Sequence, residues 1–205
     1  VVVCIAVAVV IANAQRFGSA RLTRAAARAS AAGYAVPGPV VGIGVLLTVV
    51  GVDSVLERVG LDLPGAVATG SLLVLAYAYA IRFLAPGLGA VEAGIGQVSE
   101  EMTASARTLG ATPARTMWRI HLPLSRASLI TAAVLVGVDA LKELPIVLLL
   151  RPFGFDTLPV WVYMLVSESR FQQAALPALS IVAVALVPVI LLARQLDRPH
   201  STDTP

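Results

Sequence analysis

The amino-acid sequence predicts an all-α membrane protein, a polytopic transmembrane helix bundle with a long polar loop on its cytoplasmic side. Of the 205 residues, 58% are hydrophobic and 13% are charged, whereas soluble domains carry about 25% charged residues. A soluble fold of this size has too little interior to bury so much apolar surface, so the surplus must face lipid. This composition excludes a disordered protein, a secreted disulfide scaffold and an ordinary cytosolic enzyme.

Five apolar segments qualify as spans, or nearly so, because about 20 mostly apolar residues cross the ~30 Å of hydrocarbon in a bilayer. They are residues 1–15, 35–52, 63–81, 127–141 and 171–193. The first looks like the end of a span whose start is missing. We therefore expect 1–196 to be an N-terminally incomplete membrane domain, and 197–205 to be a disordered cytoplasmic tail. Gly38 and Gly42 have the small-xxx-small spacing that favours helix packing, either inside the subunit or at a dimer seam.

The distribution of positive charge predicts the orientation of these spans, because cytoplasmic loops are enriched in Lys and Arg. If the spans alternate in direction, most of the 15 Lys and Arg residues fall on one side. That side holds the segment after the first span, the third loop and the C-terminus, which we therefore place in the cytoplasm. The cations assigned to these loops include Arg16, Arg21, Arg24 and Arg28 in the first, and Arg82, Arg107, Arg115, Arg119 and Arg126 around the third. Because they are scattered and no aromatic residues interleave them, we expect no nucleic-acid binding.

Several kinds of chemical site are excluded by residue counts. Cys4 is the only cysteine and His121 and His200 are the only histidines, so no Cys/His metal cluster can assemble. The single lysine, Lys142, follows a leucine, so the chain lacks a phosphate-binding loop of the Gly-Lys type. The spans contain no Ser-His arrangement or dense carboxylate motif, which argues against an intramembrane enzyme. We predict no catalytic residue, metal site or bound cofactor, and we expect His121 to be a surface loop residue.

The third loop, predicted over 86–126, is too long for a simple connector. A first helix is predicted over 97–109, with Gly110 following it as a C-terminal cap. Thr112 offers an N-cap oxygen to a second helix, and Pro113 suits its first position because that position needs no N–H donor. The second helix is predicted over 114–121, ending before Leu122-Pro123.

Two faces are predicted for this helix pair. One carries Ala104, Ala106, Leu109, Met117 and Ile120; the other carries Arg107, Arg115 and Arg119. Small alanines allow close approach of another surface, and Met and Ile supply adaptable apolar contact, so the pair could insert into a groove on a soluble partner. The alternative is an amphipathic pair lying on the bilayer with its arginines toward the lipid headgroups.

The stretch 104–110, followed by 120–123, resembles the "EAA" loop of binding-protein-dependent ABC importer permeases. That pattern is Glu-Ala-Ala, three residues, Gly, nine residues, then Ile-x-Leu-Pro. The matching residues are Ala106, Gly110, Ile120, Leu122 and Pro123. Ala104 replaces the glutamate and Ser105 replaces the first alanine. In the family this loop forms the coupling helix that docks into the ATPase subunit, and the missing glutamate removes one polar contact expected there.

The resemblance implies a permease subunit without enzymatic activity, in a bacterial inner membrane. Its implied partners are a cytoplasmic ABC ATPase that binds ATP and Mg, a periplasmic substrate-binding protein, a second permease half and the lipid bilayer. The residues implied to couple it to the ATPase are Ala104, Ser105, Ala106, Leu109, Gly110, Ala111, Ile120, Leu122 and Pro123.

Further segments are similar to the ferric-iron type of these permeases, in which one polypeptide carries two homologous halves. They are residues 33–38, 91–94, 139–145, 150–153 and 155–158. This chain is most similar to the C-terminal half. The resemblance implies ferric iron as the transported solute, although permeases for other small solutes share much of the pattern.

Three charged residues occur near the outer end of the fourth span. Asp139, Lys142 and Glu143 have helical i, i+3 and i+4 spacing, and Pro145 then ends the helix. Lys142 can neutralise either acid, which leaves one net negative charge. The cluster is either part of the substrate path, holding a cation briefly, or a solvated helix end whose ion pair fixes packing. It would also serve an ion-gradient-driven secondary transporter, which is the alternative function.

The segment 151–170, predicted on the outer face, carries Trp161 and Tyr163 among apolar residues. Such aromatic side chains collect at headgroup depth and anchor a protein in the interface. The alternative is a docking surface for a periplasmic binding protein.

Overall fold

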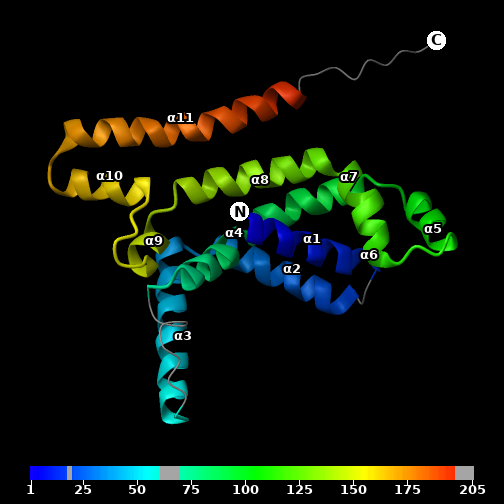
Figure 1. Cartoon of the computed structure of the whole chain (residues 1–205), viewed down its shortest axis with the longest axis horizontal. Helices are drawn as coiled ribbons and strands as arrows, with labels where there is room; N and C mark the ends of the chain where they lie inside the picture. Colours follow the sequence, from blue (N-terminus) through cyan, green and yellow to red (C-terminus); the bar gives the residue numbers. More distant parts are fainter. Residues whose placement is uncertain (18–19, 61–69, 197–205) are drawn as a thin grey trace.

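The computed structural model describes residues 1–17, 20–60 and 70–196, and every regular element in these ranges is helical (Figure 1). The predicted all-α helix bundle is therefore confirmed. The predicted start of the third span at Leu63 and the predicted tail 197–205 lie outside the described residues.

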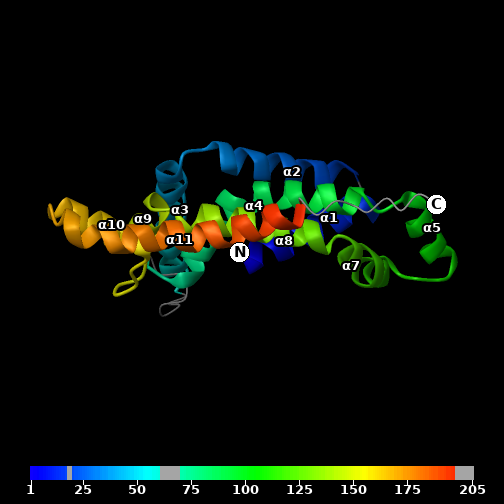
Figure 2. The ribbon, with the colours of Figure 1, turned by 90° about the horizontal axis from the view of Figure 1, so that it is seen from above.

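Four helices run side by side along the long axis of the molecule: α1 (Val2–Phe17), α2 (Ala20–Ala35), α4 (Leu72–Gly96) and α8 (Arg126–Leu141). The two views agree that α4 lies among the other three (Figure 2). Small residues of α1 let it approach α4 closely, because alanines at helix contacts bring backbones together. The buried cluster that results consists of Ala8, Ala12, Leu88, Val91, Ile95, Met117 and Ala132.

Helix α2 corrects the prediction of a charged loop after the first span. The segment is rich in alanine and arginine, both strong helix formers, and it packs along α4. A Cβ on Gly33 would lie 2.4 Å from the carbonyl oxygen of Ile81, which shows how closely the two helices approach. Charge counting identified the arginines but could not show that their segment is folded against the bundle.

Helix α3 (Gly38–Arg58) projects away from the bundle in Figure 1 and contacts α9 (Pro145–Leu150). A Cβ on Gly42 would lie 2.7 Å from Leu149 Cδ1, and one on Gly38 would lie 2.8 Å from Glu143 Oε1. The two glycines therefore serve helix packing inside the chain, as the first of the two interpretations held.

Helix α4 continues through Pro86 to Gly96, well beyond the end of the predicted span at Ile81. The loop boundary predicted at Pro86 is therefore wrong. A proline inside a membrane helix is tolerated where neighbouring helices enclose the backbone that it disturbs. Arg82, assigned to a loop by charge counting, consequently lies within the helix.

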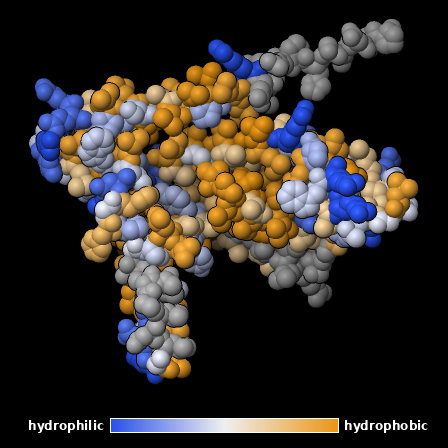
Figure 3. Space-filling model, viewed as in Figure 1, coloured by the Kyte–Doolittle hydropathy of each residue, from blue (hydrophilic) through white to orange (hydrophobic). Residues whose placement is uncertain are grey.

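Helices α10 (Leu158–Ser167) and α11 (Phe171–Leu196) form a hairpin beside the bundle (Figure 1). Among the described residues three helices are long and apolar enough to span a membrane, or four if a bent pair counts as one span, against about five predicted. Helices α1 and α10 are apolar but shorter. Apolar surface covers much of the elongated body, and hydrophilic residues gather toward its ends and at the tip of α3 (Figure 3). This surface is that of a multi-pass membrane protein.

Candidate functional site

A pair of short helices projects at one end of the long axis, between α4 and α8 (Figure 1). The first, α5 (Glu100–Thr108), begins where the Ser99 hydroxyl accepts a hydrogen bond from the backbone N–H of Met102 at 3.2 Å. Two glutamates in its first turn favour the positive end of the helix dipole. Local sequence signals therefore suffice to start this helix.

Gly110 ends α5, as predicted. Its φ of +78° lies in the left-handed region that glycine adopts without strain. The Gly110 N–H donates to the carbonyl of Arg107 at 2.9 Å, and the Ala111 N–H donates to that of Ala106 at 3.0 Å. These two bonds are the Schellman arrangement, which satisfies the last carbonyls of the helix and turns the chain sharply.

The second helix begins as predicted, with the Thr112 hydroxyl accepting from the Arg115 N–H at 3.3 Å and Pro113 in the first turn of α6 (Pro113–Thr116). Its predicted end before Leu122 is wrong. The chain continues as a π-helical turn, η1 (Met117–His121), and then as α7 (Leu122–Leu124). Pro123 fits because it lies in the first turn of α7, where its missing N–H costs little. The chain then bends by 78° into α8.

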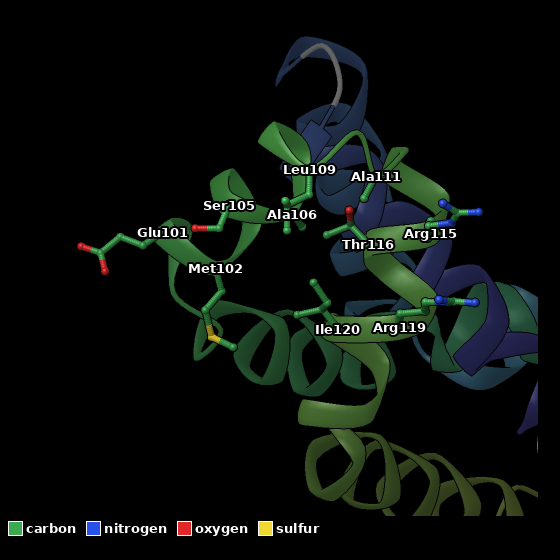
Figure 4. Close-up of a pocket in the computed structure, with 10 residues that line it drawn as sticks. All are labelled: Glu101, Met102, Ser105, Ala106, Leu109, Ala111, Arg115, Thr116, Arg119 and Ile120. Carbon is green, nitrogen blue, oxygen red and sulfur yellow. The ribbon is translucent and has the colours of Figure 1, made fainter.

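Between α5 and α6–η1 lies an open groove of about 650 Å³ (Figure 4). It is lined by Glu101, Met102, Ser105, Ala106, Leu109, Ala111, Arg115, Thr116, Arg119 and Ile120. The predicted coupling residues Ser105, Ala106, Leu109, Ala111 and Ile120 are thus brought together.

The other predicted coupling residues lie around this groove. Ala104 is exposed on the opposite side of α5, beside Arg16 and Arg107. Gly110 is exposed in the turn, and Pro123 is exposed beyond η1. Leu122 is half-buried against the core cluster and so belongs to the foundation of the helix pair.

The groove is apolar inside and charged at its rims. Leu109 is 88% exposed at the turn, so its side chain is available to a partner. Glu101 points away on one side, and Arg115 and Arg119 extend away on the other (Figure 4). Arg115 and Arg119 line the groove together with Ala106, Leu109 and Ile120, so the prediction of a separate face is wrong for these two arginines. Arg107 and Ala104 lie on the opposite side of α5, and Met117 is buried in the core. A helix or loop with an apolar ridge suits this shape.

His121 is fully buried, which corrects its prediction as a surface residue. Its Nε2 lies 3.0 Å from the Thr103 Oγ1 of α5, and its ring stacks on Phe17 of α1 with centroids 5.7 Å apart. Burial, and then the charge of Arg16, lower the pKa of the ring from its ordinary value of 6.5. The histidine therefore joins three elements as a neutral group. The sequence gives no signal for this, because Phe17 and His121 are far apart along the chain.

The ion pairs of the charged residues near Glu143 differ from those predicted. Lys142 pairs with Asp139, with Nζ and Oδ1 2.8 Å apart, while Glu143 pairs with Arg82 of α4 at 4.0 Å. Glu143 also accepts a hydrogen bond from the Ile146 N–H at 3.3 Å, at the start of α9. With Arg82 included, the four charges balance, so the predicted net negative charge is wrong. Whether the three predicted residues contact substrate stays a prediction.

The aromatic residues of the predicted outer face lie on and near α10. Trp161 is 51% and Tyr163 48% exposed, and both are available to headgroups or to a protein. In the preceding loop Arg151 pairs with Asp156, and Phe153 is fully exposed. Both interpretations of this segment stay open.

These features define a class: a multi-pass helical membrane protein that presents a grooved helix pair between two of its long apolar helices. The chain belongs to the family described as binding-protein-dependent transport system inner membrane component, whose profile matches residues 5–198. The resemblance stated from the loop motif is thus confirmed at the family level.

Two curated relatives, from Salmonella paratyphi A and Salmonella typhimurium, carry the name "Putative 2-aminoethylphosphonate transport system permease protein PhnV". Each is 29% identical over 129 residues, which is 63% of this chain and 47% of the relative. The chain spans about half the length of the curated relatives it matches. The names of these relatives refer to a phosphonate, so they give no support to the ferric-iron subtype.

Proposed function

We propose that this chain is the membrane-spanning permease subunit of an ATP-driven ABC importer. A separate cytoplasmic ATPase binds and hydrolyses ATP with Mg, and a periplasmic binding protein delivers a small solute. The chain lies in a bacterial inner membrane with its C-terminus in the cytoplasm, and a second permease half completes the translocation path. The family match and the grooved helix pair support this proposal.

The groove is the observation that carries the proposal. Its floor at Ala106 is small and buried, its rims carry charges, and the exposed Leu109 stands at the turn. Movement of an ATPase surface held there would pass through η1 and the bend into α8, since the helical segments are continuous apart from that bend. An apolar groove with a charged rim also explains how a soluble subunit docks reversibly.

The transported solute is proposed only as a class. The resemblance implies ferric iron, and the relatives are named for 2-aminoethylphosphonate, so a small solute recognised mainly by the binding protein fits both. The two are distinguished in cells that depend on this transporter. Labelled ferric iron and labelled 2-aminoethylphosphonate compete for uptake, and the solute that the cells take up is measured.

Docking is tested with Leu109→Asp. The side chain is 88% exposed, so the variant keeps the fold, while a charge placed in the apolar contact should weaken ATPase association at least about tenfold. The measurement is recovery of the ATPase with the solubilised transporter. Phe153→Asp is the matched control, because it places the same charge on a fully exposed apolar residue of the loop between α9 and α10, and this loop lies away from α5 and α6 (Figure 1).

Equal recovery of the ATPase with wild type and Leu109→Asp contradicts the proposed docking site. The secondary-transporter alternative makes a different prediction for whole cells. Under that alternative, uptake survives ATP depletion and collapses with an uncoupler; under the proposal, uptake stops when ATP is depleted.

A further inference from the structure

The last turn of α1 contacts the end of α4, the start of α5 and η1. Arg16 donates from Nη1 to the carbonyl of Ile95 at 2.6 Å and from Nη2 to that of Val98 at 2.6 Å. The same Nη2 lies 3.3 Å from the carbonyl of Ser99 and 3.2 Å from Thr103 Oγ1 on α5. One guanidinium group therefore joins α1, the end of α4 and the start of α5.

The neighbours of Arg16 extend this connection. Gln15 donates from its side-chain amide to Glu92 of α4 at 2.7 Å, and Phe17 stacks on His121 of η1. Thr103, which Arg16 contacts, also lies 3.0 Å from His121. Three consecutive residues of α1 thus contact both arms of the grooved pair and the long helix that leads to it.

Arginine is suited to this position for two physical reasons. The carbonyls at the C-terminal end of a helix lack partners within the helix, and a cation there also interacts favourably with the helix dipole. The guanidinium group offers five donors in a fixed plane, so it can bridge several carbonyls at once, whereas a lysine ammonium group cannot hold the same arrangement.

We infer that Arg16 is a positioning residue that transmits movement of α5 to α1 and α4. The inference rests on the proposed function, in which the ATPase moves the helix pair. Arg16 does not line the groove between α5 and α6. It acts behind the docking surface, on the side that faces the bundle, so its loss separates docking from transport.

The test uses the complete transporter with its ATPase, reconstituted in liposomes, and the variants Arg16→Met, Arg16→Lys and Thr103→Val. ATPase association, ATP hydrolysis and solute uptake are measured on each sample. We expect Arg16→Met to keep ATPase association and ATP hydrolysis while uptake per ATP falls about tenfold, since several charge-assisted hydrogen bonds are lost. Arg16→Lys restores part of that ratio. Arg28→Met, on an exposed arginine of α2, serves as the control and behaves as wild type.

Thr103→Val removes the bond between Arg16 and the α5 hydroxyl, together with the contacts of that hydroxyl to His121 Nε2 and to the Ser99 carbonyl, and it leaves the bonds of Arg16 to the carbonyls in place. It therefore tests the inference even if Arg16→Met fails to fold. We expect it to lower uptake per ATP by about threefold or more, since at least one hydrogen bond is lost. Unchanged uptake per ATP in Thr103→Val and in whichever Arg16 variants fold overturns the inference. A loss of ATPase association in parallel with uptake also overturns it, because it indicates general unfolding of the helix pair. Failure of the wild-type chain to bind an ATPase counts instead against the proposed function.

Discussion

Gly110 and Thr112 fix the angle between α5 and α6, and with it the shape of the groove. The positive φ of Gly110 turns the chain, and the Thr112 hydroxyl starts the next helix within two residues. A side chain larger than hydrogen at Gly110 would strain the backbone by about 1 kcal/mol or more. Two small residues thus place Leu109 at the outer edge of the groove, where it is exposed.

His121 predicts a pH dependence of stability. Its folded pKa is lowered by burial and by the charge of Arg16, so the unfolded chain binds a proton more readily than the folded chain. Stability should therefore fall as the pH drops below the ordinary value of 6.5, because protonation then favours the unfolded state. Above that value the ring is deprotonated in both states, so His121 no longer makes stability depend on pH.

The measurement is the Tm of the detergent-solubilised protein at about pH 7.5 and about pH 5.5. In His121→Gln the fall in Tm on acidification should be smaller by about 2 °C or more. His200 is present in both proteins and cancels from the comparison. An equal fall in both proteins would show that the pKa of His121 does not differ between the folded and unfolded states.

Single-residue features were predictable where they act locally and unpredictable where they act across the fold. Gly110, Thr112 and Pro113 were identified from the sequence because a cap depends on residues within one turn. Arg16 and His121 were assigned to surface loops, since their partners lie far away in sequence: 87 positions separate Arg16 from Thr103. No pattern within a short window encodes such a contact.

At the scale of elements, the contact between α4 and α8 limits how the bend after α7 can move. A Cβ on Gly94 would lie 2.3 Å from Ser128 Cβ and 2.6 Å from its Oγ. The backbone of α4 therefore contacts a side chain of α8 just beyond the bend. Such a contact leaves no space for a larger residue between α4 and the start of α8.

We expect Gly94→Ala to destabilise the protein by about 1–3 kcal/mol, the usual cost of overpacking. Adding Ser128→Gly removes both clashing atoms, so the double variant should be more stable than Gly94→Ala alone, despite the cost of a helical glycine. Gly89→Ala is the control, because it lies on the same helix with no atom within 4 Å of the added Cβ. The measurement is the Tm in detergent of the wild type, of the two single variants and of the double variant. Equal Tm values for Gly94→Ala and Gly89→Ala would contradict the proposed close contact.

Element boundaries show where sequence patterns lose information. The apolar pattern identified α3 and α11 because each is uncharged over most of its length. The same pattern ended the third span too early, because Arg82 and Pro86 are typical of loops. In the structure both lie within α4, where neighbouring helices accommodate them. The pattern also missed α2, whose arginines suggested a loop. Burial by neighbouring helices, which decides these cases, is a property of the tertiary structure.

At the scale of the whole molecule, the arrangement separates two ends. The grooved pair of α5 and α6 lies at one end of the long axis, and the loop between α9 and α10 lies toward the other (Figure 1). Apolar side chains are exposed on the helices between them, among them Val10, Leu47, Leu73, Leu179 and Leu191. A nonpolar environment must cover this surface, because exposed apolar area of this extent is unfavourable in water.

This separation predicts which residues are reached from each side of the membrane. Cys4 is buried and is the only cysteine, so replacing it by alanine gives a background for single-cysteine labelling. Leu109→Cys places a thiol at the groove, and Phe153→Cys places one in the loop at the opposite end; both positions are highly exposed. A membrane-impermeant maleimide reacts only with thiols on the side to which it is added.

In spheroplasts with intact membranes, we expect the maleimide to label Phe153→Cys and to leave Leu109→Cys unlabelled until the membrane is permeabilised. The physical reason is the excess of Lys and Arg on the side that carries the helix pair, which favours the cytoplasm. Labelling of both positions after permeabilisation is the control for thiol reactivity. The reverse pattern would place the groove outside the cell, where no ATPase could reach it, and both the orientation and the proposed docking would then be wrong.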